Sequence, residues 1–165
     1  MDDHDKSALH SGLALFTDLY ELTMARAYFD LAMNERAVFS LFVRKLPAHR
    51  NYLIACGLES LVTGLERFCF STDDLGYLAS IGMFPDPFLV WLESFRFTGD
   101  VFAVAEGTAV FANEPLLEVV APIAEGQLIE TLVLNQIGVQ TLLASKASRI
   151  VAAARGRRVV DFGAR

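Results

Sequence analysis

Hydrophobic positions along the first third of the chain predict a helix followed by a strand. Apolar side chains recur at roughly helical spacing over residues 17–33. Thr17 or Asp18 is expected to cap this helix, because either side chain accepts from the free amides of a first turn. Residues 37–43 are β-branched and aromatic, which is typical of a strand. Their near-continuous apolarity indicates burial on both faces, as in a parallel or central strand.

Further helical patterns occupy the middle and the last third of the chain. They cover residues 52–68, a segment capped by residues 71–74, and a segment that opens at the prolines of residues 85–87 and runs to about residue 95. Residues 123–154 form a long helical pattern, with a bend or break expected near residues 135–138.

Short extended segments alternate with these helices. Strands are predicted over residues 101–104, 108–111, 116–120 and 157–162. No internal repeat or low-complexity tract interrupts this order. The mixture of strands and helices predicts an α/β or α+β fold.

Composition supports a single folded domain. The chain has 165 residues, of which 53% are hydrophobic and 21% charged. A net charge of -6 argues against a nucleic-acid-binding surface, which would be basic. No apolar run reaches the roughly 20 residues that cross a membrane. The acidic start lacks the apolar centre of a signal peptide, and residues 1–13 are interpreted as a disordered leader.

Cysteine and histidine usage indicates a cytoplasmic protein without a metal site. Cys56 and Cys69 lie in apolar stretches and are predicted to be buried reduced thiols, with a disulfide between them as the alternative. His4, His10 and His49 do not pair at metal-ligand spacing. Glycine-rich phosphate and dinucleotide loops and the nucleophile elbow of serine hydrolases are absent from the sequence.

Asp18 and Tyr20 stand two residues apart at the start of the first predicted helix. One interpretation is structural, with Asp18 as a cap and Tyr20 as an amphipathic ring at the edge of the core. The functional interpretation is that Tyr20 offers a flat ring for stacking on an aromatic substrate. The spacing alone leaves both interpretations open.

Two cations, Arg44 and Lys45, follow the first predicted strand directly and precede Pro47. They fit a solvated strand end. They also fit an anion site, because a guanidinium offers a planar fork of donors to phosphate oxygens. Turn chemistry fully explains the polar residues of segments 106–108 and 113–115.

The final residues, Asp161–Arg165, suit a ligand pocket at a strand end. Phe162 can stack on a ring, Gly163 allows a close backbone approach, and Arg165 can bind a carboxylate or a phosphate. Ligands of α/β folds lie at the carboxyl ends of strands. An ordinary strand end with a glycine turn remains the structural alternative.

In order and setting, these segments resemble nicotinate phosphoribosyltransferases over nearly the whole chain after about Ala14. The opening match is Thr17-Asp18-Leu19-Tyr20-Glu21-Leu22-Thr23-Met24. The later matches are residues 39–47, Gly57-Leu58-Glu59, residues 95–101, 106–108 and 111–116, the helix with Gln127, Glu130 and Asn135, and residues 161–165.

The resemblance implies an activity and a fold. Members of this family join nicotinate to phosphoribosyl pyrophosphate, giving nicotinate mononucleotide and pyrophosphate in NAD salvage. ATP hydrolysis is coupled through a transiently phosphorylated histidine, and Mg²⁺ is expected as a counter-ion, with no tightly bound cofactor. The implied fold is α/β, with residues 14–122 as an amino-terminal domain. Residues 123–165 would then be the helix and first strand of an irregular type II phosphoribosyltransferase barrel.

The resemblance also implies site roles and a dimer with shared sites. Tyr20, with Asp18 beside it, looks like the ring that stacks on the pyridine from the partner subunit, and Phe162 like the ring on its other face. Arg165 looks like a contact for the pyridine substrate or its phosphoribosyl partner. Arg44, and less directly Lys45, look like phosphate contacts.

The phosphorylated histidine of the family lies beyond residue 165, so the chain carries no catalytic residue and is expected to be an inactive fragment. The expected partner is a second subunit or a complementing carboxyl-terminal chain. One alternative is a non-catalytic interaction module or remnant that pairs with such a chain. Another is a related phosphoribosyltransferase that uses nicotinamide or quinolinate.

Overall fold

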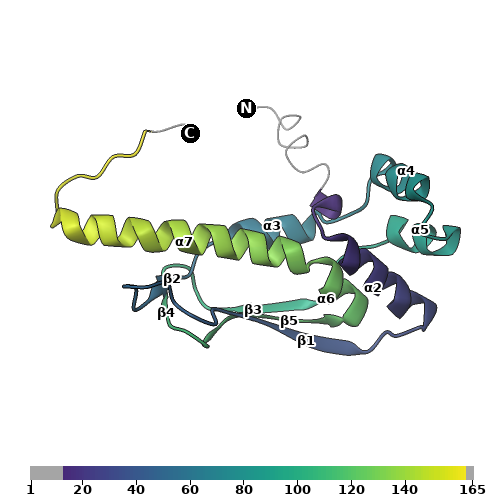
Figure 1. The fold of residues 1–165 in the computed structure, drawn as a ribbon, viewed down its shortest axis with the longest axis horizontal. Helices are drawn as coiled ribbons and strands as arrows, with labels where there is room; N and C mark the ends of the chain where they lie inside the picture. Colours follow the sequence, from purple (N-terminus) through teal and green to yellow (C-terminus); the bar gives the residue numbers. More distant parts are fainter. Residues whose placement is uncertain (1–12, 163–165) are drawn as a thin grey trace.

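The computed structural model of the chain describes residues 13–162, in which helices cover two small antiparallel sheets (Figure 1). The helices are η1 (Leu13–Leu15), α2 (Leu19–Asp30), α3 (Leu58–Glu66), α4 (Thr72–Ile81), α5 (Asp86–Glu93), α6 (Ile123–Leu128) and α7 (Glu130–Ala154). The strands are β1 (Arg36–Phe42), β2 (Leu53–Ile54), β3 (Asp100–Ala103), β4 (Ala109–Val110) and β5 (Pro115–Pro122). The predicted mixture of helices and strands is confirmed.

The larger sheet has the order β1-β5-β3, with β5 in the centre and every pair antiparallel. The side chains of Leu117, Val119 and Ala121 on β5 are buried, and α6 packs on this strand. Phe39 and Leu41 of β1 pack against the same core. This face of the sheet therefore packs toward the helices and away from solvent.

The prediction that β1 is buried on both faces, as a parallel or central strand, is wrong. The strand lies at the edge of the sheet, and burial alternates along it. Val38 is 63% exposed and Phe42 is 44% exposed, because both lie on the outer face. Apolar residues on a solvent-facing side conceal the period of two that marks such a strand.

The second predicted helix begins later than expected. Leu53 and Ile54 form β2, which pairs with β4, and α3 starts only at Leu58. Gly57 separates the two with a φ of 105°, and a Cβ there would lie 2.4 Å from the backbone oxygen of Gln136. The close approach to α7 therefore requires glycine at this position.

Side chains of helix α7 bond to the backbone of residues 52–56, as a neighbouring strand would. Thr141, Ser145 and Arg149 recur every four residues and so lie on one face of the helix. The backbone N–H of Ile54 donates to Ser145 Oγ at 2.7 Å, and the other two side chains also bond to this backbone. These contacts satisfy backbone groups of β2 and of the residues on either side of it.

The long helical pattern breaks at Ile129 rather than near residues 135–138. Ile129 has a φ of -96° and a ψ of 0°, ending α6 and preceding α7. Residues 135–138 lie within α7, where Gly138 has open space beside its Cα. A single glycine inside a helix weakens it without breaking it.

Two further predictions, the strand over residues 157–162 and the burial of both cysteines, are wrong. Residues 157–162 form no strand within the described chain, and they are exposed in the segment that follows α7 (Figure 1). Cys69 is exposed and Cys56 half-buried, and both are free thiols. Apart from Leu13, the predicted leader lies outside the described residues. No helix among residues 13–162 has the length and apolarity to span a membrane.

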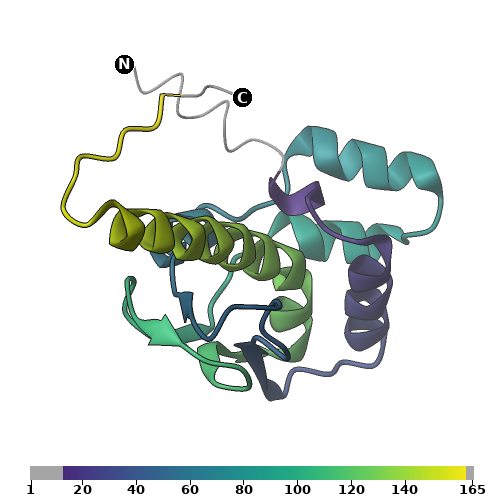
Figure 2. The ribbon, with the colours of Figure 1, turned by 60° about the vertical axis from the view of Figure 1, so that its left-hand side comes forward.

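Helices α4 and α5 pack against each other and lie next to α2 (Figure 2). The predicted cap of α4 is confirmed, since Ser71 and Asp74 form a reciprocal capping box. Phe88 on α5 is fully buried, stacks on Trp91 and meets Phe29 of α2 edge to face. The carboxyl-terminal end of α2 is thereby attached to α5.

The ring of Phe39 rests directly on the backbone of α6. A Cβ added at Gly126 would lie 2.2 Å from Phe39 Cε2, far inside van der Waals contact. Glycine at position 126 therefore sets the distance between β1 and the helical layer.

We expect Gly126→Ala to lower the free energy of unfolding by about 1–3 kcal/mol, the typical cost of overpacking. The matched control is Gly138→Ala, another helical glycine, where an added Cβ meets no atom within 4 Å. The control should be neutral or stabilising by up to about 1 kcal/mol. Urea denaturation of both variants tests the difference, and equal stability of the two would contradict the close contact.

Candidate functional site

The predicted site residue Tyr20 lies where the first turn of α2 meets the start of α7. Asp18 is the N-cap residue of α2, but its side chain makes no capping hydrogen bond. The Thr17 hydroxyl instead donates to the carboxylate of Glu21. Tyr20 is 46% exposed, so one part of its ring is open to a ligand while the other faces the protein.

Glu21 is the most buried carboxylate of the described chain, with 1% of its surface exposed. Its oxygens accept from the hydroxyls of Thr17 and Thr131, the latter at 2.7 Å. Burial raises the pKa of Glu21, the two hydroxyl groups oppose this rise, and the nearby Glu130 and Asp18 add to it. The residue thus ties α2 to the first turn of α7.

The pKa of Tyr20 is raised to about 12, first by desolvation and then by Glu130, Glu21 and Asp18. Glu130 is the first residue of α7. Its Oε2 accepts from Gln127 Nε2 at 2.7 Å, and Gln127 is buried. The phenol of Tyr20 is therefore protonated at neutral pH.

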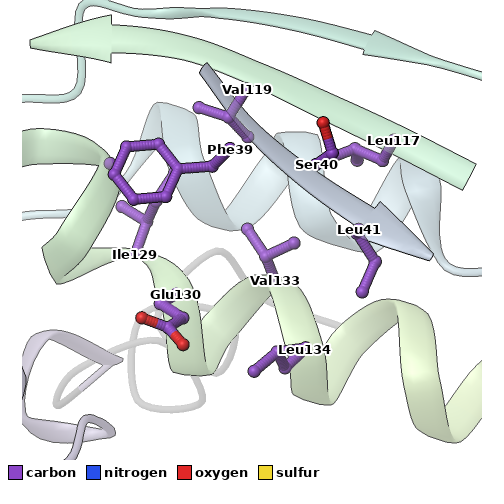
Figure 3. A pocket seen from close by; sticks show the side chains of 10 residues that line it. Phe39, Ser40, Leu41, Leu117, Val119, Ile129, Glu130, Val133 and Leu134 are labelled. Carbon is purple, nitrogen blue, oxygen red and sulfur yellow. The ribbon is translucent and has the colours of Figure 1, made fainter. Parts of the chain in front are cut away.

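Glu130 also lines a pocket of about 190 Å³ between β1 and the start of α7. Figure 3 shows Phe39 and Leu41 of β1 facing Ile129 and Val133 across this pocket, with Glu130 on the helical side. Apart from Glu130 and Ser40, the lining is apolar or glycine. Glu130 therefore contributes the one carboxylate of an otherwise mostly apolar pocket.

Arg44 and Lys45 are exposed and belong to the loop after β1, which leads to β2 and away from α2 (Figure 1). Neither forms a hydrogen bond or ion pair with any described residue. Lys45 lines a separate pocket of about 220 Å³ between the loop after β1 and the middle of α7. Within this chain, the two cations and Tyr20 do not form a common site.

Phe162 is 91% exposed and belongs to the segment after α7, so it does not meet Tyr20. The predicted pairing of these two rings around one ligand is not formed within this chain. Arg165, the last predicted site residue, lies outside the described residues.

Glu21 has no predicted role of its own, and Gln127 and Glu130 are predicted only as matches to a family. The sequence around Glu21 could have indicated a buried carboxylate, because Glu21 stands beside the apolar Leu22 in the predicted helix. Its position on the buried face of α2 indicates a buried polar contact. The partner Thr131 is separated by 110 residues and could not be found from spacing.

Comparison with solved structures defines the class of protein to which this α/β arrangement corresponds. The chain aligns with human nicotinic acid phosphoribosyltransferase at a TM-score of 0.81 and 31% identity, covering 90% of this chain and 31% of that one. A nicotinate-nucleotide pyrophosphorylase from Pyrococcus furiosus has the same fold at a TM-score of 0.70 and 19% identity, over 99% of this chain and 34% of that one. The arrangement is the amino-terminal part of a phosphoribosyltransferase.

The family model for the nicotinate phosphoribosyltransferase (NAPRTase) N-terminal domain matches residues 15–138. The chain belongs to this family. The nicotinate phosphoribosyltransferase pncB2 of Mycobacterium tuberculosis is 60% identical over 152 residues, which are 92% of this chain and 33% of the relative. That of Bacillus subtilis is 41% identical over 93% of this chain and 31% of the relative. The chain thus spans about a third of the length of these relatives.

The pKa of Glu21 predicts how pH affects stability. Because burial raises this pKa above 4.5, the folded chain holds the proton more tightly than the unfolded chain. The contribution of Glu21 to the free energy of unfolding is therefore largest below pH 4.5 and decreases as pH rises through the raised pKa.

We expect Glu21→Gln to remove this dependence, so that its stability relative to the unmodified chain increases as pH rises. Urea denaturation at intervals from about pH 4 to 7 measures the difference. Glu66→Gln, at an exposed position, controls for the loss of one charge. A difference between Glu21→Gln and the unmodified chain that decreased with pH would contradict the burial of this carboxylate.

Proposed function

We propose that the chain supplies the amino-terminal part of an enzyme that joins nicotinate to phosphoribosyl pyrophosphate, with ATP hydrolysis coupled to the reaction. The products are nicotinate mononucleotide and pyrophosphate, on a route to NAD. The observation that carries the proposal is the 60% identity to a nicotinate phosphoribosyltransferase over 92% of this chain. The chain spans about a third of that relative, so the remaining parts of the active site are assigned to further polypeptide.

Tyr20 is proposed to stack on the pyridine ring of nicotinate, in a site completed by a second subunit. Its half-exposed ring supports this role, since a flat aromatic surface that is open to solvent can stack on an aromatic ligand. Glu130, Glu21 and Asp18 surround it with negative charge. The carboxylate of nicotinate would therefore point away from this cluster and toward a cation, for which we propose Arg165.

Arg44, with Lys45 beside it, is proposed to contact a phosphate of the phosphoribosyl partner. The two side chains are exposed and make no ion pair with the described residues, so their charges are available to a ligand. A cation at this position would stabilise the charge that develops on the departing pyrophosphate. Phe162 is proposed to cover the other face of the pyridine. We assign no described residue to ATP or Mg²⁺.

The long helix α7 supports the proposal of a protein partner. Six of its large apolar side chains are exposed: Leu134, Val139, Leu142, Leu143, Ile150 and Val151. We propose that these side chains bind the carboxyl-terminal two thirds of the enzyme, whether in the same polypeptide or in a complementing one. Their exposure also favours the second candidate function, a non-catalytic module that pairs with such a chain. The proposed location is the cytoplasm.

Residues 1–165 alone should form no nicotinate mononucleotide from nicotinate, phosphoribosyl pyrophosphate, ATP and Mg²⁺. A chimaera in which this chain replaces the matching third of the Mycobacterium tuberculosis relative should be active, because the two segments are 60% identical. Robust turnover by residues 1–165 alone would refute the first expectation. A folded but inactive chimaera would favour the interaction module, and preference for nicotinamide or quinolinate would indicate a related enzyme.

In the chimaera, Tyr20→Ala should raise the KM for nicotinate about tenfold, since an aromatic stacking contact contributes about 0.5–1.5 kcal/mol beyond buried area. Arg44→Ala should instead raise the KM for phosphoribosyl pyrophosphate by about tenfold or more, through loss of a charged hydrogen bond. Arg67→Ala, at an exposed position, is the control. Steady-state kinetics with each substrate varied in turn distinguishes the roles, and unchanged KM values would contradict them.

A further inference from the structure

The buried carboxylate of Glu21 links the first turn of α2 to α7 by hydrogen bonds. Its Oε1 atom accepts from the hydroxyl of Thr131 in the first turn of α7 at 2.7 Å, and its Oε2 atom accepts from the hydroxyl of Thr17, just before α2. The residue is 1% exposed, so the two hydroxyl groups replace the water that a carboxylate binds at a surface. Glu21 therefore joins the residues before α2, its first turn and the start of α7.

The first turn of α2 has no side-chain cap. Asp18 is the N-cap residue, but its side chain accepts no capping hydrogen bond. The first amides of a helix have no acceptor within it, so an uncapped first turn opens easily. The bond between Thr17 and Glu21 spans this turn, which includes Tyr20, and therefore holds it closed.

The remainder of α2 is attached by other contacts. Leu22 and Ala25 are buried, and the helix packs on α6. Near its carboxyl-terminal end, the ring of Phe29 meets Phe88 of α5 edge to face. Loss of the carboxylate's bonds should therefore release the first turn, which carries Tyr20, while the rest of the helix stays in place.

We propose that Glu21, held by Thr131, is a positioning residue that fixes the first turn of α2, and with it Tyr20, where the ring stacks on the pyridine. This inference rests on the proposed function, because it assigns a task within the same site. A turn that is closed before binding removes an ordering cost from the binding step, so the effect falls on affinity for the pyridine substrate. Equal weakening of the bound substrate and the transition state raises KM and leaves kcat unchanged.

Helix α7 offers a matched pair of variants. Thr131→Val removes the hydroxyl that bonds to Glu21 and keeps a side chain of nearly the same shape. Thr141→Val makes the same change further along the helix, where the hydroxyl bonds to the backbone nitrogen and oxygen of Cys56 at 3.2 Å. Both variants lose a hydroxyl that is bonded within the fold, but only the first releases the start of α2.

Amide hydrogen exchange tests the attachment in residues 1–165 without any activity. The amides of Thr23 and Met24 report opening of the first turn, because in an α-helix they donate to residues 19 and 20. Thr131→Val should accelerate their exchange about tenfold or more relative to Thr141→Val, the equivalent of a lost hydrogen bond to a charged group. The amides of residues 28–30 should change less than twofold. Equal changes at both ends of α2, or none at its start, would overturn the inference.

Kinetics in the chimaera test the positioning role. Thr131→Val should raise the KM for nicotinate roughly three- to tenfold, the equivalent of a side chain left unordered before binding. The kcat and the KM for phosphoribosyl pyrophosphate should change less than twofold, and Thr141→Val should leave the nicotinate KM unchanged. Thr131→Ser keeps the hydroxyl and should restore most of the affinity. Equal nicotinate KM values in Thr131→Val and the unmodified chimaera, or equal losses for both substrates, would overturn the role.

A double variant separates this inference from the proposed function. With Tyr20→Ala already present, Thr131→Val should have no further effect on the nicotinate KM, because the ring that is positioned is gone. A full additional loss would overturn the inference. If Tyr20→Ala raises the nicotinate KM and Thr131→Val does not, the proposed function stands and the positioning role fails. If Tyr20→Ala itself leaves this KM unchanged, the proposed function fails and the role fails with it.

Discussion

Burial of the Glu21 carboxylate constrains the whole amino-terminal part of this molecule. A carboxylate withdrawn from water must find donors, and the hydroxyls of Thr17 and Thr131 provide them. Because Thr131 lies in the first turn of α7, its hydrogen bond to Glu21 fixes where the start of α2 packs against that helix. Tyr20, the preceding residue, is thereby brought near Glu130, which lines the apolar pocket.

Helix α7 connects features that are distant in sequence. Its first turn bonds to α2, its middle bonds to the backbone of residues 52–56, and several of its large apolar side chains are exposed. Helix α2, which carries Tyr20, lies at one end of the molecule, and the loop after β1, which carries Arg44, leads to β2 and away from α2 (Figure 1). Residues proposed for one reaction thus lie apart within this chain, which is understandable if active sites are shared between subunits.

Local signals predicted much of the fold, and contacts distant in sequence explain the errors. Ser71 with Asp74 marked a helix start because capping acts within one turn. By contrast, β2 depends on Ser145, which is 91 residues away, and an apolar segment alone does not distinguish strand from helix. The site shows the same division, since the residue type suggested Tyr20, whereas the hydrogen bond of the neighbouring Glu21 to Thr131 arises only in the folded chain.

The contact between Phe39 and Gly126 also affects how this family can diverge. With no space between the ring and the helix backbone, position 126 cannot acquire a side chain while position 39 carries phenylalanine. A smaller residue at position 39 would remove the obstacle but open a cavity under β1. The two positions should therefore vary together across homologues, with glycine retained wherever the aromatic ring is retained. Paired variation of these two positions in homologous sequences would thus reflect the packing distance between β1 and α6.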